Sequence, residues 1–243
     1  MKLSLSGLTH TGLKRDHNED SFWISPELGA AIVSDGMGGH AAGEVASAIT
    51  VESFKKVVAS RLPNASTIDD VITILSNSIG LANQEVTIAG KKKTAMRTMG
   101  ATAVCACLWN ETFAVANIGD SRAYLIQGGI ITRLTRDDSY VQQLIDGGFI
   151  DEEEARFHPN KNIVTRHIGS MKDAVPSLST VHVEAGYRMV LCSDGLNSAV
   201  TDEEILGIVS GAETAETVCR MLIDRTLENG APDNVTAVVF ETS

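Results

Sequence analysis

The sequence predicts an α+β fold in which two antiparallel sheets lie between layers of helices. Two pairs of amphipathic helical segments, one in each half of the chain, enclose a run of short apolar strands. Turns of a few residues join several of these strands, and such short connections are typical of antiparallel hairpins. No internal repeat or linker interrupts the 243 residues, so we expect a single domain spanning residues 1–243.

The first part of the chain predicts three strands followed by a helix pair. Leucines alternate with other residues over 3–8, Phe22 opens an aromatic strand, and residues 30–33 form a short apolar run. Apolar side chains then recur at helical spacing over residues 43–60 and over residues 66–88. Two successive amphipathic helices predict an antiparallel pair that covers one face of a sheet.

The remainder of the chain predicts hairpins followed by a second helix pair. The expected hairpins join residues 101–108 with 113–118, 122–126 with 130–134, and 181–183 with 188–192. The expected helices and the last strand cover residues 201–209, 212–228 and 235–240. Helix pairs near both ends of the chain, with hairpins between them, indicate helices outside two sheets.

Residues 147–172 form a polar, irregular segment. It follows a short predicted helix at residues 140–145 and contains another at residues 152–157. Long irregular segments in compact domains are often lids or binding loops. They are also often surface excursions with no role of their own. The composition leaves these two interpretations open.

Composition disfavours several classes of protein. The formal net charge of −11 disfavours binding to nucleic acid, which needs a basic surface. The four cysteines lack zinc-binding spacing, and so few in a chain of this length fit a reducing compartment. The N-terminal residues lack a signal peptide's apolar core, and no apolar run has the roughly 18 residues of a membrane helix. We therefore expect a cytoplasmic protein that binds neither nucleic acid nor membrane.

The most informative stretch is residues 30–40, where an apolar strand runs into Asp35 and a glycine-rich turn. A carboxylate at a strand end, beside bare backbone carbonyls, suits a hard cation that prefers oxygen ligands. Taken alone, Asp35 is equally well explained as part of a turn that caps the next helix. The placement recurs, however, at four further strand ends, with Asp16, Glu19 and Asp20, Asp120, Asp194, and Asp233. Carboxylates gathered in one pocket repel one another, so we predict more than one divalent cation.

Six short motifs carry these residues, each at a strand end: RDHNED (15–20), DGMGG (35–39), GAT (100–102), GDSR (119–122), SDG (193–195) and DN (233–234). A single motif of this kind is weak evidence. All six in this order, over about residues 3–240, resemble the metal-dependent (type 2C, PPM) serine/threonine protein phosphatases, especially the compact bacterial members. The family's fold is a central antiparallel β-sandwich with helix pairs on both sides, an αββα arrangement with a small flap subdomain.

The resemblance implies a core site for two Mn²⁺ or Mg²⁺ ions. By its motif, Asp35 corresponds to the family's bridging ligand of both ions, and the Gly36 carbonyl corresponds to a ligand of one of them. Asp194 and Asp233 correspond to ligands of the second ion. Glu19 corresponds to a residue that acts through a metal-bound water.

The resemblance also assigns residues around that core. Asp120, together with the aspartate of the SDG motif, matches a third and weaker metal site of bacterial members, and Arg15 matches the residue that holds the substrate phosphate. Residues 147–172 match the flap. Animal members carry a histidine directly after the Asp-Gly pair as a proposed general acid, whereas this chain, like bacterial relatives, has Met37. His40 or a metal-bound water is a candidate replacement, and a packing or capping role for His40 is the alternative.

The implied reaction is hydrolysis of phosphoserine and phosphothreonine in proteins by direct attack of a metal-bridged hydroxide on phosphorus. Two ions lower the pKa of a shared water enough to supply hydroxide near neutral pH. The ions and Arg15 stabilise charge on the phosphoryl oxygens. No side-chain nucleophile is needed, so Ser34, Ser193 and the cysteines are interpreted as structural.

Three functions compete. The first is a monomeric protein phosphatase in signal transduction, which opposes a bacterial serine/threonine kinase and acts on that kinase or its phosphorylated targets. The second is a catalytically weak regulator that binds phosphoproteins, and the intact Arg15, Asp35, Asp194 and Asp233 argue against it. The third is a hydrolase of small phosphoesters or nucleotides. Because the chain has no glycine-rich phosphate loop with lysine, nucleoside triphosphate binding lacks support.

Overall fold

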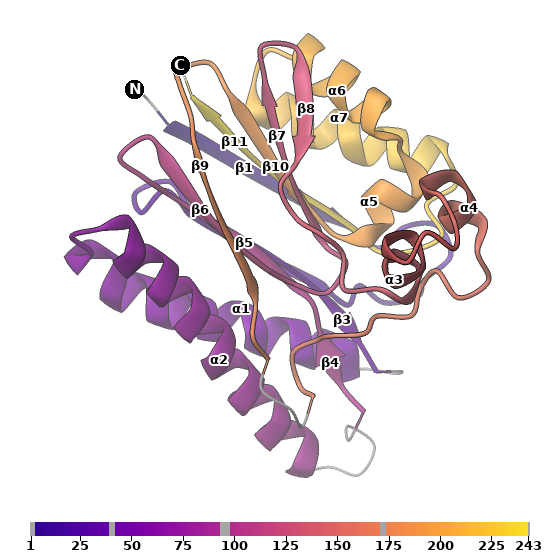
Figure 1. The fold of residues 1–243 in the computed structure, drawn as a ribbon, viewed down its shortest axis with the longest axis horizontal. Helices are drawn as coiled ribbons and strands as arrows, with labels where there is room; N and C mark the ends of the chain where they lie inside the picture. The colour runs from indigo at the N-terminus through magenta and orange to yellow at the C-terminus, as the bar shows by residue number, and fades with distance from the viewer. Residues whose placement is uncertain (1–2, 39–41, 93–97, 171–173, 243) are drawn as a thin grey trace.

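The computed structural model describes residues 3–38, 42–92, 98–170 and 174–242 as two stacked antiparallel sheets with helices on both outer faces (Figure 1). The first sheet has the strand order β1-β11-β10-β7-β8. Its strands are β1 (Leu3–His10), β7 (Arg122–Gln127), β8 (Ile130–Arg133), β10 (Arg188–Cys192) and β11 (Val235–Thr242). The second sheet has the order β2-β3-β5-β6-β9, with β4 beside β3. Its strands are β2 (Asp20–Ser25), β3 (Ala30–Met37), β4 (Gly100–Ala101), β5 (Ala103–Trp109), β6 (Thr112–Ile118) and β9 (Ser177–His182).

Each sheet carries its own helices. The second sheet is covered by α1 (Ala42–Arg61) and α2 (Ile68–Lys92), which pack against each other and are joined through a 3-10 turn, η1 (Leu62–Asn64). The first sheet carries α5 (Asp194–Ala199), α6 (Asp202–Gly211) and α7 (Ala215–Glu228). Two short helices, α3 (Tyr140–Asp146) and α4 (Glu152–Phe157), lie together at one end of the sandwich (Figure 1). The predicted four-layer α+β architecture is confirmed.

Three apolar layers hold the sandwich together, and strand alternation explains them. Ile32 on β3 faces the α1–α2 layer with Cys105, whereas its neighbour Val33 faces the other sheet. Between the sheets, the ring of Phe113 packs edge-on against Phe240 at 5.1 Å between centroids. The third layer lies between the first sheet and α6–α7. Because side chains of both sheets form the central layer, the two sheets share one core, and a single domain over residues 1–243 stays our prediction.

Two of the three predicted hairpins are confirmed and the third is wrong. The strands β5 and β6 pair, as do β7 and β8. The strands β9 and β10 do not pair with each other, because β9 joins β6 in one sheet and β10 joins β7 and β11 in the other. Val183 and Tyr187, which flank the connecting turn, are buried between the sheets. The connection is therefore a crossover between layers.

Several element boundaries differ from the prediction. The helix α2 continues to Lys92 instead of ending near residue 88, with two lysines in its last turn where cations favour a helix end. The strand β9 begins at Ser177, earlier than residue 181, and α5 was not predicted. No helix in the described part of the chain is both long and apolar enough to cross a membrane.

Candidate active site

The predicted acidic residues from both sheets come together at one end of the sandwich. Asp20 and Asp35 are directly opposite each other on β2 and β3. The side chain of Asp35, near the end of β3, is hydrogen-bonded to that of Asp194, the first residue of α5. The charge of Asp120 also acts on Asp35, and that of Asp233 acts on Asp194. Five segments that are distant in the sequence therefore build one acidic centre.

The backbone around Asp35 is held by the threonine of the GAT motif. Thr102 Oγ1 accepts a hydrogen bond from the Asp35 N–H at 3.0 Å, and its own N–H donates to the Asp35 carbonyl at 2.8 Å. Ser34 Oγ donates to the Thr102 carbonyl, and Thr102 Oγ1 also contacts Ser121 Oγ at 2.7 Å. This network fixes the end of β3 against the segment that carries Asp120.

Burial makes these carboxyl groups difficult to ionise without a cation. It raises the pKa of Asp35 well above its usual range, and the charges of Asp20, Asp194 and Asp120 raise it further. Burial and the charge of Asp194 do the same to the pKa of Asp120. The pKa of Asp194 is raised by burial and by Asp233. The site therefore favours either bound protons or bound cations.

Asp20 belongs to this centre, although it was not among the predicted ligands. Its Oδ2 accepts hydrogen bonds from Ser193 Oγ and Thr236 Oγ1, both at 2.7 Å, and its Oδ1 has no partner among the described residues. Burial raises the pKa of Asp20 to about 7 despite these two bonds. Its side chain shares a face of β2 with Phe22 and Ile24, which pack between the sheets. That alternation is the sequence signal that places Asp20 inside.

The predicted residues Glu19 and Gly36 meet in a space that admits only glycine. The Gly36 N–H donates to the Glu19 carbonyl at 3.1 Å. A Cβ on Gly36 would lie 2.0 Å from the carbonyl oxygen of Gly43, and a Cβ on Gly43 would lie 2.8 Å from Glu19 Oε1. The Glu19 side chain accepts a hydrogen bond from the Gly43 backbone, and burial raises its pKa. The absence of a side chain at Gly43 lets the Glu19 carboxylate approach the Gly43 backbone, and the absence of one at Gly36 lets the Gly36 and Gly43 peptides lie against each other.

Arg15 forms the cationic edge of the site. Its Nη2 lies 2.7 Å from Asp233 Oδ2, and its side chain is half exposed. Asn234 organises the loop that carries Arg15, because its Oδ1 accepts from the Glu19 N–H and its Nδ2 donates to the carbonyls of Thr11 and His17, all at 2.8 Å. The DN motif thus positions the arginine loop as well as supplying a carboxylate.

The chemistry of this donor set fits divalent cations. The buried Oδ1 atoms of Asp20 and Asp194 lack hydrogen-bond partners within the described ranges, and the surrounding carboxylates raise one another's pKa. Hard cations take such oxygen ligands and relieve the repulsion. Among the described residues, no three acidic, histidine or cysteine side chains are arranged so that together they could hold a metal ion. Instead, Asp233 is paired with Arg15 and Asp35 is hydrogen-bonded to Asp194.

His40 lies outside the described residues, so its predicted role as a proton donor stays a prediction. The segment predicted as a flap is described from residue 147 to residue 170 and includes α4. Near the end of this segment, Arg166 links it to the rest of the domain, because its Nε donates a hydrogen bond to Asp138 Oδ1 at 2.8 Å. Asp138 Oδ2 accepts from the Gly119 N–H at 3.0 Å, next to Asp120. The sequence prediction missed this link between the flap and the acidic centre.

Comparison with known proteins agrees with this arrangement. Residues 26–235 match the family model described as Protein phosphatase 2C. The chain is 37% identical over 230 residues to the serine/threonine protein phosphatase PstP of Mycobacterium tuberculosis, covering 95% of this chain and 43% of that protein. The chain thus spans less than half the length of this relative.

Solved structures show the same fold. The serine/threonine phosphatase Stp1 from Staphylococcus aureus superposes with a TM-score of 0.93 and 33% identity, covering 100% of this chain and 96% of that one. The catalytic domain of PstP in complex with two manganese ions has a TM-score of 0.88 and 32% identity, covering 98% and 97%. The extent of the family match and the shared fold show that the chain belongs to the protein phosphatase 2C family.

Proposed function

We propose that the chain hydrolyses phosphoserine and phosphothreonine in phosphorylated proteins with the help of divalent cations. The observation that carries this proposal is the convergence of buried and partly buried carboxylates from five chain segments beside an exposed arginine. Relatives named serine/threonine phosphatases, which are similar over nearly the whole chain, support the substrate class. Opposition to a bacterial serine/threonine kinase follows from that substrate class as part of the same proposal.

The proposed metal ligands are the carboxylates of Asp35, Asp194 and Asp233 and the carbonyl of Gly36, with Glu19 acting through a water. Two Mn²⁺ or Mg²⁺ ions are proposed for this core because a solved relative contains two manganese ions. Asp120 is proposed for a third ion, since its buried carboxyl faces Asp194 and Asp137 with a strongly raised pKa. Asp20 is proposed to position this core, because its carboxylate accepts hydrogen bonds from Ser193, next to Asp194, and from Thr236.

Arg15 is suited to bind the phosphoryl group. A planar guanidinium donates several hydrogen bonds to phosphate oxygens. The contact with Asp233 engages Nη2 and orients the group, and the half-exposed side chain leaves donors for a substrate. When bound, divalent cations lower the pKa of a coordinated water and neutralise charge on phosphate. The chain's own contribution is to hold the carboxylates rigidly and to place Arg15 at the open edge.

We propose direct attack of water on phosphorus because the described residues offer no activated side-chain nucleophile. Ser34 Oγ is committed to the Thr102 carbonyl, and Ser193 Oγ is fully buried against Asp20. Burial raises the pKa of Cys192, the cysteine directly before Ser193, to about 12, so its thiol stays protonated.

Met37 cannot donate a proton to the leaving alkoxide, and His40 is our proposed donor.

The test is hydrolysis of a phosphothreonine peptide with Mn²⁺, with and without chelator, by the wild type and by Asp194→Ala. We expect phosphate release that needs both the metal and Asp194. Asp224→Ala on the exposed face of α7 is the matched control and is expected to keep wild-type activity. Peptide binding without turnover in the presence of Mn²⁺ would instead identify a phosphoprotein-binding regulator. A strong preference for small phosphoesters over peptide would favour the third function.

A further inference from the structure

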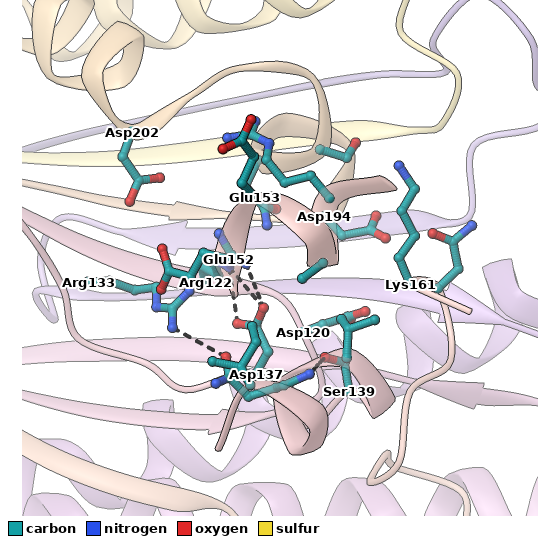
Figure 2. A pocket seen from close by; sticks show the side chains of 18 of the residues that line it. Asp120, Arg122, Arg133, Asp137, Ser139, Glu152, Glu153, Lys161, Asp194 and Asp202 are labelled. Carbon is teal, nitrogen blue, oxygen red and sulfur yellow. Dashed lines mark hydrogen bonds and ion pairs between the residues drawn. The ribbon is translucent and has the colours of Figure 1, made fainter. Parts of the chain in front are cut away.

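A pocket of about 360 Å³ opens beside the acidic centre, between α3–α4 and the start of α5–α6 (Figure 2). Its inner end is formed by Asp120 and Asp194. The side chain of Asp120 is buried, and the Oδ1 of Asp194 has no hydrogen-bond partner among the described residues. The volume is within the range of pockets that hold small molecules or single large side chains. The pocket therefore continues the candidate active site towards the flap.

Two of the charged residues that line the pocket, Arg122 and Asp137, form an ion pair, so their charges cancel. Arg122 donates to both carboxylate oxygens of Asp137 from Nε, at 3.0 and 3.1 Å, and from Nη2 at 2.7 Å. Its Nη1 donates to Tyr124 Oη at 3.0 Å. Both charged partners are largely buried, so the pair is a fixed part of the pocket and not a free charge. The charge of a ligand that the pocket prefers therefore depends on the other lining residues.

The wall carries more carboxylates than cations. Glu152 and Glu153 line it from α4, and Asp202 and Glu203 line it from α6. No described hydrogen bond or ion pair engages the carboxylates of Glu152, Glu153 or Asp202. The cations on the wall besides Arg122 are Arg133, Arg156 and Lys161.

These three cations do not neutralise the wall. Arg133 donates to Gln142 at 3.3 Å, and the charge of Arg156 acts on Glu203. In Figure 2, Lys161 lies at the right of the view and Asp202 at the left, with Glu153 between them. With four carboxylates from α4 and α6 against these three cations, the wall keeps a net negative charge.

The same pocket has an apolar side. Val141, Ile145 and Ala155 line it alongside the carboxylates. Lysine and arginine side chains combine an aliphatic stem with a charged head, so they fit a cavity with apolar walls and acidic groups. The net charge of −11 also favours approach of cationic segments.

We propose that this pocket binds a lysine or arginine side chain of the phosphoprotein substrate, a few residues from the phosphorylated residue. This inference rests on the proposed function, because the phosphate at the acidic centre determines which part of the substrate reaches the pocket. The carboxylates of Glu152, Glu153 and Asp202 pair with the basic head group, and the apolar wall holds its stem. The pocket thereby makes the enzyme selective for phosphorylated sites in basic sequences.

The experiment compares phosphothreonine peptides in which one arginine, alanine or glutamate is placed at each position from four before to four after the phosphorylated residue. The variant combines Glu152→Gln, Glu153→Gln and Asp202→Asn. Its matched control combines Glu216→Gln, Asp224→Asn and Glu228→Gln on α7, which alters the net charge equally but away from the pocket. Two quantities are measured: kcat/KM with Mn²⁺, and peptide affinity by fluorescence polarisation in chelator, where turnover is absent.

We expect at least one position where arginine raises kcat/KM about tenfold over alanine, as for a hydrogen bond to a charged group. The pocket variant should lose this preference and the α7 control should keep it. Equal use of all peptides, or a preference that survives in the pocket variant, overturns the inference. So does a preference for glutamate, which would indicate that Arg156 and Lys161 select anions. If no peptide is hydrolysed but arginine-dependent binding is present and lost in the variant, the inference stands and the proposed activity fails.

Discussion

At the scale of single residues, we expect the carboxyl groups of the acidic centre to lower the stability of the metal-free protein. Asp20 and Asp120 are buried, Asp35 and Asp194 are partly buried, and each of the four has a raised pKa. Uncompensated buried polar groups destabilise a folded protein by about 1–3 kcal/mol each. Substitutions that remove one charge should therefore have opposite effects on activity and on the stability of the metal-free protein.

Asp194→Asn tests this opposition. With Mn²⁺, we expect kcat to fall about 10³-fold, because a metal ligand that acts on the transition state contributes several kcal/mol. In chelator at pH 8, we expect the free energy of unfolding to rise by about 1–3 kcal/mol, since a neutral amide is easier to bury than a carboxylate and is not repelled by Asp233. Urea denaturation followed by circular dichroism measures the second quantity. Lower stability in chelator would show that the charge of Asp194 is compensated in a way we have not identified.

Arg166 provides a second test, of the link between the flap and Asp120. Arg166→Gln removes the donor to Asp138, which holds the Gly119 N–H beside Asp120. We expect the weakest-bound Mn²⁺ to bind about 10- to 100-fold less tightly, as is typical when a ligand's supporting contact is lost. Calorimetric titration with Mn²⁺ measures this directly. Arg220→Gln, an exposed substitution on α7, is the control, and equal affinities in the two variants would contradict the link.

Residue-level prediction succeeded where a motif marks the residue and failed where the partners are distant. The motifs placed Glu19, Asp35 and Asp194 at strand ends, and the structure brings these ends together. The place of Asp20 depends on Ser193 and Thr236, which are 173 and 216 residues away in the sequence. No local pattern records a contact across such a separation, although the alternation of β2 indicates the inward side.

At the scale of elements, the site depends on the close approach of β3 and the start of α1. A Cβ on Gly36 would lie 2.0 Å from the Gly43 carbonyl oxygen, a distance that only backbone movement relieves. The predicted glycine-rich turn is thus explained by packing of a helix start against a strand end. The position of the Gly36 carbonyl, which we propose as a metal ligand, depends on the same approach.

Gly36→Ala is expected to destabilise the protein by about 1–3 kcal/mol, the usual effect of overpacking a rigid site, and to abolish most activity. Gly207→Ala is the matched control, because Gly207 lies in α6 and an added Cβ meets no atom within 4 Å. That control should stabilise the helix by up to about 1 kcal/mol. Thermal unfolding of both variants measures the difference. Equal melting temperatures would refute the packing argument.

Predictions of elements were reliable where the signal is local. Thr201 caps α6 through a hydrogen bond from the Glu204 N–H, as the TDEE sequence indicates. The β9–β10 hairpin was wrong, because a short turn between apolar runs does not reveal whether the chain stays in one sheet. Here the burial of Val183 and Tyr187 favours crossing between sheets. Only the three-dimensional packing decides this.

At the scale of the whole molecule, the acidic centre makes stability depend on pH and on metal. The folded-state pKa of Asp20 is about 7, whereas carboxyl groups in an unfolded chain have a pKa of about 4. The folded form therefore binds protons more tightly, and its stability is greatest below the unfolded value and falls as pH rises through the folded one.

We accordingly expect the chelated protein to lose free energy of unfolding between pH 5 and pH 8. Mn²⁺ should remove this loss, because cations replace the protons on the carboxylates. Asp20→Asn should make the profile in chelator flatter. Denaturant titrations at four pH values, with metal or with chelator, measure the effect. A chelated protein whose stability rises over this range would contradict the arrangement of raised pKa values described above.

The pairing of the first strand with the last affects how the chain folds. Leu3 pairs with Thr242 and His10 pairs with Val235 (Figure 1). The strand β1 therefore has no partner in its sheet until β11 has been synthesised. Contacts between such distant segments close slowly. A nascent chain that has not yet produced β11 cannot attach β1 to the first sheet, and it also lacks Asp233. The pairing of β1 and the addition of Asp233 to the acidic centre are therefore expected in the same step of folding.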